Sequence, residues 1–260
     1  VLYILAFLQK LSVYYKITIT RGGRALGVSG GMFRRYKYAL LADEISSVDL
    51  RYRLFLRFFR RCSVLIGVSG YGGGGFLPVL VPSSPFFEAA REQRRLLPEF
   101  SGFYCPIRPG VKDFHLNHAL PFAAAALLCA AGVAAGGLAP REYETFINVW
   151  GLVLTAWFIW VSVNKACAAS HTGLGFHAGH ICAMYERKRV FHRVILPNDK
   201  IIGVSIKQDP LQRRHGTCRV AIYERGVRAK KHVVRGMPYK TVTENLAGSC
   251  GFGRSTTGRG

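Results

Sequence analysis

The sequence predicts an α+β fold in which two modules of antiparallel strands are joined by a hairpin of two apolar helices. Residues 119–139 and residues 145–164 carry no charge. Each run of about 20 residues is long enough to cross the hydrocarbon core of a membrane as a helix. The segments before and after these runs have strand-like patterns that match each other when the chain is shifted by 156 positions. These two observations give the predicted order of module, membrane hairpin and module.

The first module is predicted over residues 11–98. Residues 1–10 precede it, and we interpret them as the end of a truncated membrane helix, with a buried first strand as the alternative. Ser84 and Pro85 predict the start of a helix that Pro98 ends. Several antiparallel strands therefore precede one closing helix. The expected strands cover 14–20, 25–31, 35–41, 63–69 and 76–81, with another beginning near Ile45 and a hairpin turn at 21–24.

A linker at 99–118 leads into the predicted transmembrane hairpin at 119–164. Only residues 140–144 separate the two apolar runs, so the two helices must be antiparallel. This turn contains one Arg and two Glu, whereas Arg108, Lys112 and Lys165 flank the hairpin. Because short cytoplasmic segments are enriched in Lys and Arg, we expect both modules to be cytoplasmic and the protein to be multi-pass. A buried hairpin in a soluble core is the alternative.

The second module is predicted over residues 165–246, with a short closing helix from Pro238 and a disordered tail at 247–260. At the shift of 156 positions the two modules share identities without a gap. The apolar identities fall at strand spacing, so we expect the same core to be built twice. The matching pairs include Gly23 with Gly179, Asp43 with Asp199, Ile45 with Ile201, Val48 with Val204, Arg57 with Arg213, Cys62 with Cys218 and Val64 with Val220.

Two segments at corresponding places in the modules resemble a known family. They are ALLADEISSVDLRYRLFLRFF in the first module and VILPNDKIIGVSIKQDPLQRRHG in the second. Both are similar to the pattern of the bacterial PH-like, membrane-flanked domain proteins of the YdbS/YdbT type: a strand, an I-x-x-V step, and a short basic linker before the next strand. The resemblance implies two PH-like modules, each a bent antiparallel sheet plus a C-terminal helix. It also implies a bacterial plasma (inner) membrane, and little about activity.

The charge of the chain indicates an anionic partner. Its 36 Lys and Arg residues stand against 14 Asp and Glu residues, and the excess lies outside the apolar hairpin. Basic surface beside a membrane favours the anionic inner leaflet, by about 1 kcal/mol for each well-placed cation. We therefore expect anionic membrane lipids as partners, with a protein partner or a homo-oligomer as the other candidates. The hairpin disfavours nucleic acid.

The segment 51–61 (RYRLFLRFFRR) is the strongest candidate for a lipid-binding site. If it is helical, one face carries arginines and the other carries large apolar residues, as in a basic interfacial helix. The alternative is a short connecting helix with its Phe residues in the core and its Arg residues in solvent. The candidate headgroup residues are Arg53, Arg57, Arg60, Arg61, Phe55, Phe58 and Phe59.

The remaining motifs give weaker indications of function. His177, His180 and Cys182, with His171, resemble metal ligands, but the repeat places them around a plain hairpin turn, so we expect no metal. Residues 70–75 (GYGGGG) are expected to be a flexible loop, since no Lys-Ser/Thr follows them. Asp43 is expected in a turn, and Cys62 and Cys218 in the core. Gly132 and Gly136 form a GxxxG step that predicts close helix packing, within the hairpin or between subunits.

These observations predict a non-enzymatic integral membrane protein without a cofactor. The modules are expected to act as a scaffold that binds the inner leaflet, a partner protein, or both. The alternative is a membrane device that handles lipid or a small amphiphile, with the hairpin as part of a larger bundle. A basic nucleic-acid binder is the third hypothesis.

Overall fold

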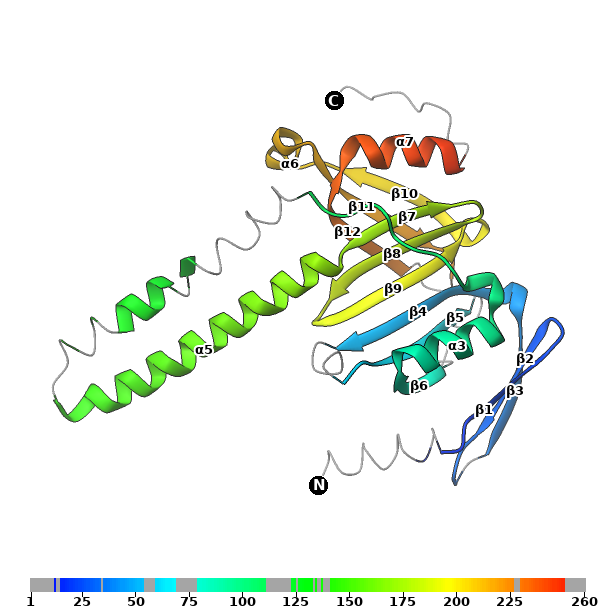
Figure 1. Cartoon of the computed structure of the whole chain (residues 1–260), viewed down its shortest axis with the longest axis horizontal. Helices are drawn as coiled ribbons and strands as arrows, with labels where there is room; N and C mark the ends of the chain where they lie inside the picture. The colour runs from blue at the N-terminus through cyan, green and yellow to red at the C-terminus, as the bar shows by residue number, and fades with distance from the viewer. Residues whose placement is uncertain are drawn as a thin grey trace.

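The computed structural model describes residues 12, 15–33, 35–53, 59–68, 79–110, 123–124, 126–132, 134, 137, 141–226 and 230–250 (Figure 1). Within these residues, twelve strands form three antiparallel sheets, and a few helices accompany them. The predicted mixed α+β class is therefore confirmed. The predicted membrane helix end at 1–10, the loop at 70–75 and the last residues of the predicted tail, 251–260, lie outside the described residues.

The first half of the chain contains two groups of three strands followed by a helix. A short 3-10 turn, η1 (Ala42–Glu44), joins the groups. Gly23 adopts a φ of +61° between the first two strands, a conformation that glycine tolerates, which confirms the predicted hairpin turn. The elements are β1 (Thr18–Gly22), β2 (Ala25–Gly30), β3 (Tyr36–Leu41), β4 (Ile45–Arg53), β5 (Arg61–Val68), β6 (Val79–Pro85), α3 (Phe86–Leu96) and η2 (Pro98–Phe100).

The second half has its six strands and closing helix in the same order, with a short helix, α6, described in addition between its fourth and fifth strands. Its elements are β7 (Gly173–His177), β8 (His180–Arg187), β9 (Val190–Pro197), η3 (Asn198–Lys200), β10 (Ile201–Lys207), α6 (Pro210–His215), β11 (Thr217–Glu224), β12 (Lys230–Pro238) and α7 (Tyr239–Cys250). The closing helix begins one residue after Pro238. It continues to Cys250, so residues 247–250 are helical rather than part of a disordered tail.

The two halves also share backbone irregularities 156 positions apart. A β-bulge interrupts the pairing at the start of β4 and of β10, and each half has a left-handed residue before its fifth strand. The first residue of each closing helix donates its N–H to the carbonyl of that left-handed residue. The matching positions are Ile45–Ser47 with Ile201–Gly203 for the bulge, and Arg60 with Gly216 for the left-handed residue.

The central feature of the fold is a six-stranded sheet that crosses from one half to the other. Its order is β6-β5-β4-β9-β8-β7, and β4 pairs antiparallel with β9 from Val48–Ile195 to Arg53–Val190. The sequence predicted two modules but not this shared sheet. Figure 1 shows β4 and β9 side by side in the middle of the molecule. All six residues from Ile45 to Leu50 are buried, because both faces of β4 are covered.

Two hydrophobic cores lie on opposite faces of this sheet. The first core also contains Cys182 and Ile195 from the second half, so the halves share packing as well as hydrogen bonds. The second core includes Leu174, Val194, Leu196, Cys218, Val220, Ile222 and Val242. The predicted linker belongs to this structure too: Cys105 and Ile107 are buried, and Ile107 forms a bridge with Leu174 of β7.

Helix α5 (Arg141–His171) contains the second predicted apolar run and projects away from the sheets (Figure 1). Among the described residues, it is the one helix long and apolar enough to cross a membrane. Residues 165–171, which were predicted to open the second module, form its last turns. The first predicted run, 119–139, is described only in part, so the predicted multi-pass topology is not supported by a second helix of this kind.

Candidate functional site

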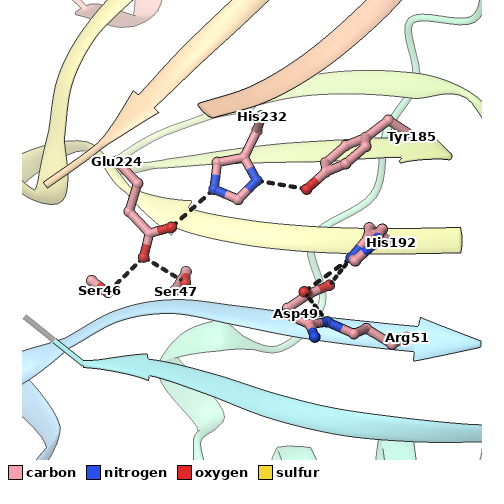
Figure 2. A network of polar contacts seen from close by, with 8 residues as sticks. All are labelled: Ser46, Ser47, Asp49, Arg51, Tyr185, His192, Glu224 and His232. Carbon is pink, nitrogen blue, oxygen red and sulfur yellow. Dashed lines mark hydrogen bonds and ion pairs between the residues drawn. The ribbon is translucent and has the colours of Figure 1, made fainter. Parts of the chain in front are cut away.

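A buried carboxylate occupies the junction between the two halves. Glu224, the last residue of β11, is only 3% exposed. Its Oε1 accepts hydrogen bonds from Ser46 Oγ at 2.6 Å and from Ser47 Oγ at 2.7 Å, both on β4. Its Oε2 lies 2.9 Å from His232 Nε2 on β12. Figure 2 shows that these contacts connect strands from both halves of the chain.

The contacts continue through His232 to an aromatic stack. In the tautomer whose Nε2–H donates to the Glu224 carboxylate, Nδ1 accepts a hydrogen bond from the Tyr185 hydroxyl, at 2.7 Å. The Tyr185 ring stacks on the His192 ring, with centroids 5.1 Å apart and planes inclined by 11°. Glu224, His232 and Tyr185 are all buried, so this chain of groups is shielded from bulk solvent.

A second buried carboxylate lies on the same face of β4. Asp49 accepts a hydrogen bond from His192 Nδ1, at 3.0 Å to its nearer oxygen, Oδ2. The same oxygen lies 2.5 Å from Arg51 Nε. We call the whole set the junction network, and its members are Ser46, Ser47, Asp49, Arg51, Tyr185, His192, Glu224 and His232 (Figure 2).

The surroundings of the two carboxylates hold both in the charged form. Burial alone would raise the pKa of Glu224, but hydrogen bonds from His232 and Ser46, the charge of Lys230 and the hydrogen bond from Ser47 lower the pKa to about 2. Burial would likewise raise the pKa of Asp49, but His192 and Arg51 lower it. Burial, followed by the nearby charge of Asp49, raises the pKa of the Tyr185 hydroxyl.

These shifts predict a loss of stability in acid. A carboxylate whose folded pKa is depressed contributes stability that is present above its unfolded pKa of 4.5 and is lost as the pH falls towards about 2. For Glu224 the difference corresponds to about 3 kcal/mol. We expect the free energy of unfolding to drop over this window in the parent chain and to drop less in Glu224→Gln, measured by denaturant titration at successive pH values. Identical pH profiles for both chains would contradict this assignment.

Gly67 on β5 makes room for the network. A Cβ atom built at this position would lie 2.9 Å from Glu224 Oε1 and 2.9 Å from Ser46 Oγ, and closer still to Ser47 Oγ. These separations are shorter than real Cβ contacts, so an added methyl group would displace hydrogen-bonded atoms. Glycine is therefore required here by the close approach of a buried carboxylate.

The contacts of the junction network indicate a structural role, in which buried polar groups hold strands of the two halves together. Ser46 and Ser47 are 2% and 1% exposed, so their hydroxyl groups are not accessible to a substrate in this conformation. They donate to Glu224 while His232 holds the other carboxylate oxygen, which leaves the buried charge well compensated. Within the described residues, no group of three His, Cys, Asp or Glu side chains is arranged to hold a metal ion.

Three of the four side chains that resemble metal ligands, His177, His180 and Cys182, contact other groups. His177 Nε2 lies 2.7 Å from the carbonyl oxygen of Tyr104, and the His180 ring stacks on Phe103 with centroids 4.5 Å apart. The Sγ of Cys182 lies 2.6 Å from the Sγ of Cys105. Each of the three side chains thus contacts the segment 101–110 that crosses β7 and β8.

The arginines at the two ends of segment 51–61 are described, and they do not lie in a helix. Arg53 ends β4 and Arg61 begins β5, while Arg60 lies in the turn before β5 with a φ of +49°. Pairing with β9 and β5 keeps residues 51–53 extended, and Arg61 pairs with Pro85 of β6, so the described ends of the segment are strands. Phe59 is 63% exposed. Three of the candidate residues, Phe55, Arg57 and Phe58, lie outside the described residues.

The predicted helix-packing glycines are described only at Gly132. A Cβ atom built there would lie 3.8 Å from the Cα of Gly151 in α5, so two backbones approach closely at this point. Gly136 lies outside the described residues.

Sequence reasoning missed the junction network because its members are not repeated. At a shift of 156 positions, Glu224 corresponds to Val68 and Asp49 to Ser205. A carboxylate that replaces an apolar or neutral residue in only one copy of a strand was the available signal, since such a group must find a partner specific to that copy.

Comparisons with known proteins add no family to this geometry. A scan against protein-family models finds no match, and searches of curated proteins and of solved structures find none either. The function is therefore inferred from the residues and contacts of this chain.

Proposed function

We propose that this protein is a non-enzymatic, membrane-anchored scaffold in which α5 holds two joined PH-like modules at the surface of a bacterial plasma membrane. The observation that carries the proposal is the exposed apolar surface of α5. Leu152 is 71% exposed, and Phe146, Trp150 and Trp160 are also exposed. An exposed apolar surface of this extent marks a membrane or protein contact, and its length favours a membrane.

The assignment of the modules to the PH-like type has two sources of support. One is the resemblance of the two segments named above to the membrane-flanked family. The other is that both halves have six strands and a closing helix in the same order, with matching bulges and left-handed residues 156 positions apart. A duplicated module accounts for all of these features, because bulges are retained when a fold is copied.

The scaffold role is supported by the way the halves are joined. The β4–β9 pairing and the junction network fix the second half against the first, so any surfaces they present are held at a constant separation.

A lipid-handling device is the second candidate, favoured by the close approach of Gly132 to Gly151, which is the packing expected in a helical bundle. Arg108 and Lys165, at the module end of the apolar region, support a cytoplasmic position for both modules.

The anchor can be tested by placing charges on α5. The full chain, expressed in bacterial cells, is expected to stay in the membrane pellet after washing with alkaline carbonate. The double variant Leu152→Arg, Leu154→Arg adds about 3 kcal/mol of insertion cost per arginine, so we expect its alkali-resistant fraction to fall by about tenfold or more.

The matched control is Leu211→Arg, which changes an exposed leucine on α6 and should leave the parent distribution unaltered. Release of the folded parent chain by carbonate would rule out an integral anchor. Retention of the double variant at the parent level would show that α5 does not provide it.

A further inference from the structure

The hairpin between β8 and β9 ends in an unusual pair of residues. Arg187 pairs with Val190, which leaves Lys188 and Arg189 as a two-residue turn. Both have positive φ, +53° and +62°. Such turns normally contain Asn-Gly, because other side chains disfavour this conformation. Two long cations are therefore held at a hairpin tip against the local preference of the backbone, which is a recurring property of functional positions.

This tip lies against the apolar helix. The guanidinium carbon of Arg189 is 5.2 Å from the centroid of the Trp157 ring on α5. Trp157 and Trp160 are 52% and 45% exposed, and Trp is enriched where a membrane helix crosses the interface. In α5 itself the first cation after the apolar run is Lys165, about 12 Å further along the helix. The hairpin thus brings positive charge to a level of the helix that has none of its own.

More basic residues lie at the same end of the strands of the six-stranded sheet. The register places Arg53 of β4 opposite Val190, directly beside the turn. Arg60 and Arg61, at the other end of the β4–β5 connection, are exposed. The neighbouring carboxylate, Glu186, accepts the backbone N–H of Arg189 and so stabilises the turn. This end of the strands therefore carries more basic side chains than the single neighbouring carboxylate, Glu186, can balance. We call four of them the basic tip: Lys188, Arg189, Arg60 and Arg61.

We propose that the basic tip binds the phosphate groups of anionic phospholipids in the leaflet where α5 meets the modules. This proposal rests on the membrane anchoring proposed above and adds the ligand chemistry. Guanidinium groups bind phosphate through paired hydrogen bonds, and Lys and Arg side chains extend from an apolar surface to the headgroups. Figure 1 shows the β8–β9 end of the sheet next to α5, so anchoring the helix places the tip at the bilayer.

The test uses the full chain reconstituted into phosphatidylcholine vesicles. The protein has three tryptophans, all in α5. Brominated lipid quenches their emission when it lies beside them. A minor fraction of brominated phosphatidylglycerol is therefore compared with the same fraction of brominated phosphatidylcholine. We expect the parent chain to favour phosphatidylglycerol by about fivefold at low salt, and less at high salt.

The decisive variant is Lys188→Asn, Arg189→Gly. It removes two charges and installs the residues that this turn prefers, so its melting temperature should not fall. We expect its preference for phosphatidylglycerol to drop by about fivefold. Lys188→Gln, Arg189→Gln should behave alike if charge is the cause. Arg94→Gln, Arg95→Gln, which removes two exposed cations from α3, is the matched control and should keep the parent preference.

The outcomes separate the two proposals. A chain that is not quenched by either brominated lipid is not inserted, and membrane anchoring itself fails. A chain that is quenched equally by both lipids is anchored without a headgroup site, and only the present inference fails. An unchanged preference in the Asn-Gly variant also overturns it. Loss of the preference in this variant and not in the α3 control supports it, and would make a protein partner unnecessary to explain the basic tip.

Discussion

Replacing Glu224 by alanine is expected to lower the free energy of unfolding by about 3 to 5 kcal/mol. Removing a buried, hydrogen-bonded carboxylate leaves its donors without partners, and this cost exceeds that of losing a surface contact. Here the orphaned groups would be the hydroxyls of Ser46 and Ser47 and the Nε2–H of His232. Because Glu224 lies at the junction of the halves, the loss should loosen the β4–β9 pairing as well as the local contacts.

The measurement is denaturant unfolding of the full chain at neutral pH, followed by circular dichroism. Glu92→Ala serves as the control, because its carboxylate is partly exposed and lies 3.7 Å from Arg95 in a helix-surface pair. Such pairs contribute little, and we expect a change within about 0.5 kcal/mol. Equal effects of the two substitutions would show that the buried contacts around Glu224 do not stabilise the contact between the two halves.

Replacing Gly67 by alanine is expected to cost about 2 to 4 kcal/mol, an effect unusual for the addition of one methyl group. The new Cβ would meet Glu224 Oε1 and Ser46 Oγ at distances that force these atoms apart. The cost combines overpacking with hydrogen bonds left unmade in a buried site. The parallel substitution Gly203→Ala on β10 is the control, since a Cβ there meets nothing within 4 Å and should cost less than about 1 kcal/mol.

A double variant identifies the cause. If Gly67 serves the buried carboxylate, removing that carboxylate removes one of the three close contacts of the new Cβ and frees the Ser46 and Ser47 hydroxyl groups to rotate away from it. The combined cost of Gly67→Ala and Glu224→Ala should therefore be clearly less than the sum of the single costs. The same unfolding measurement gives all three values. Additive costs would indicate that the methyl group acts elsewhere in β5.

The junction has a consequence for a scaffold. Two modules tied only by a linker would sample many relative positions, and the surfaces of each would act independently. The shared sheet removes that freedom, so a partner that contacts both halves binds them without ordering them first. The basic tip depends on this arrangement as well, because its four cations come from β5 and the turn before it in one half and from the β8–β9 turn in the other.

Local features of the fold were predictable because they depend on residues close in sequence. Gly23 and Gly179 adopt positive φ in the turns where they were expected, and Cys62 and Cys218 are buried. The uncharged run at 145–164 forms the central part of a long exposed helix. Alternation, turn residues and the absence of charge act within one element, so each can be recognised without knowing what packs against it.

The α+β class, the order of most strands and the apolar helix could be predicted from the amino-acid sequence. How the two halves meet depends on contacts between distant residues. Pairing of β4 with β9 joins residues that are more than a hundred positions apart, and no local pattern indicates which strand edges will find each other. The same pairing keeps Arg53 in a strand instead of a helix. It also brings Ser46 and Ser47 to Glu224, a contact that exists only once both halves have folded.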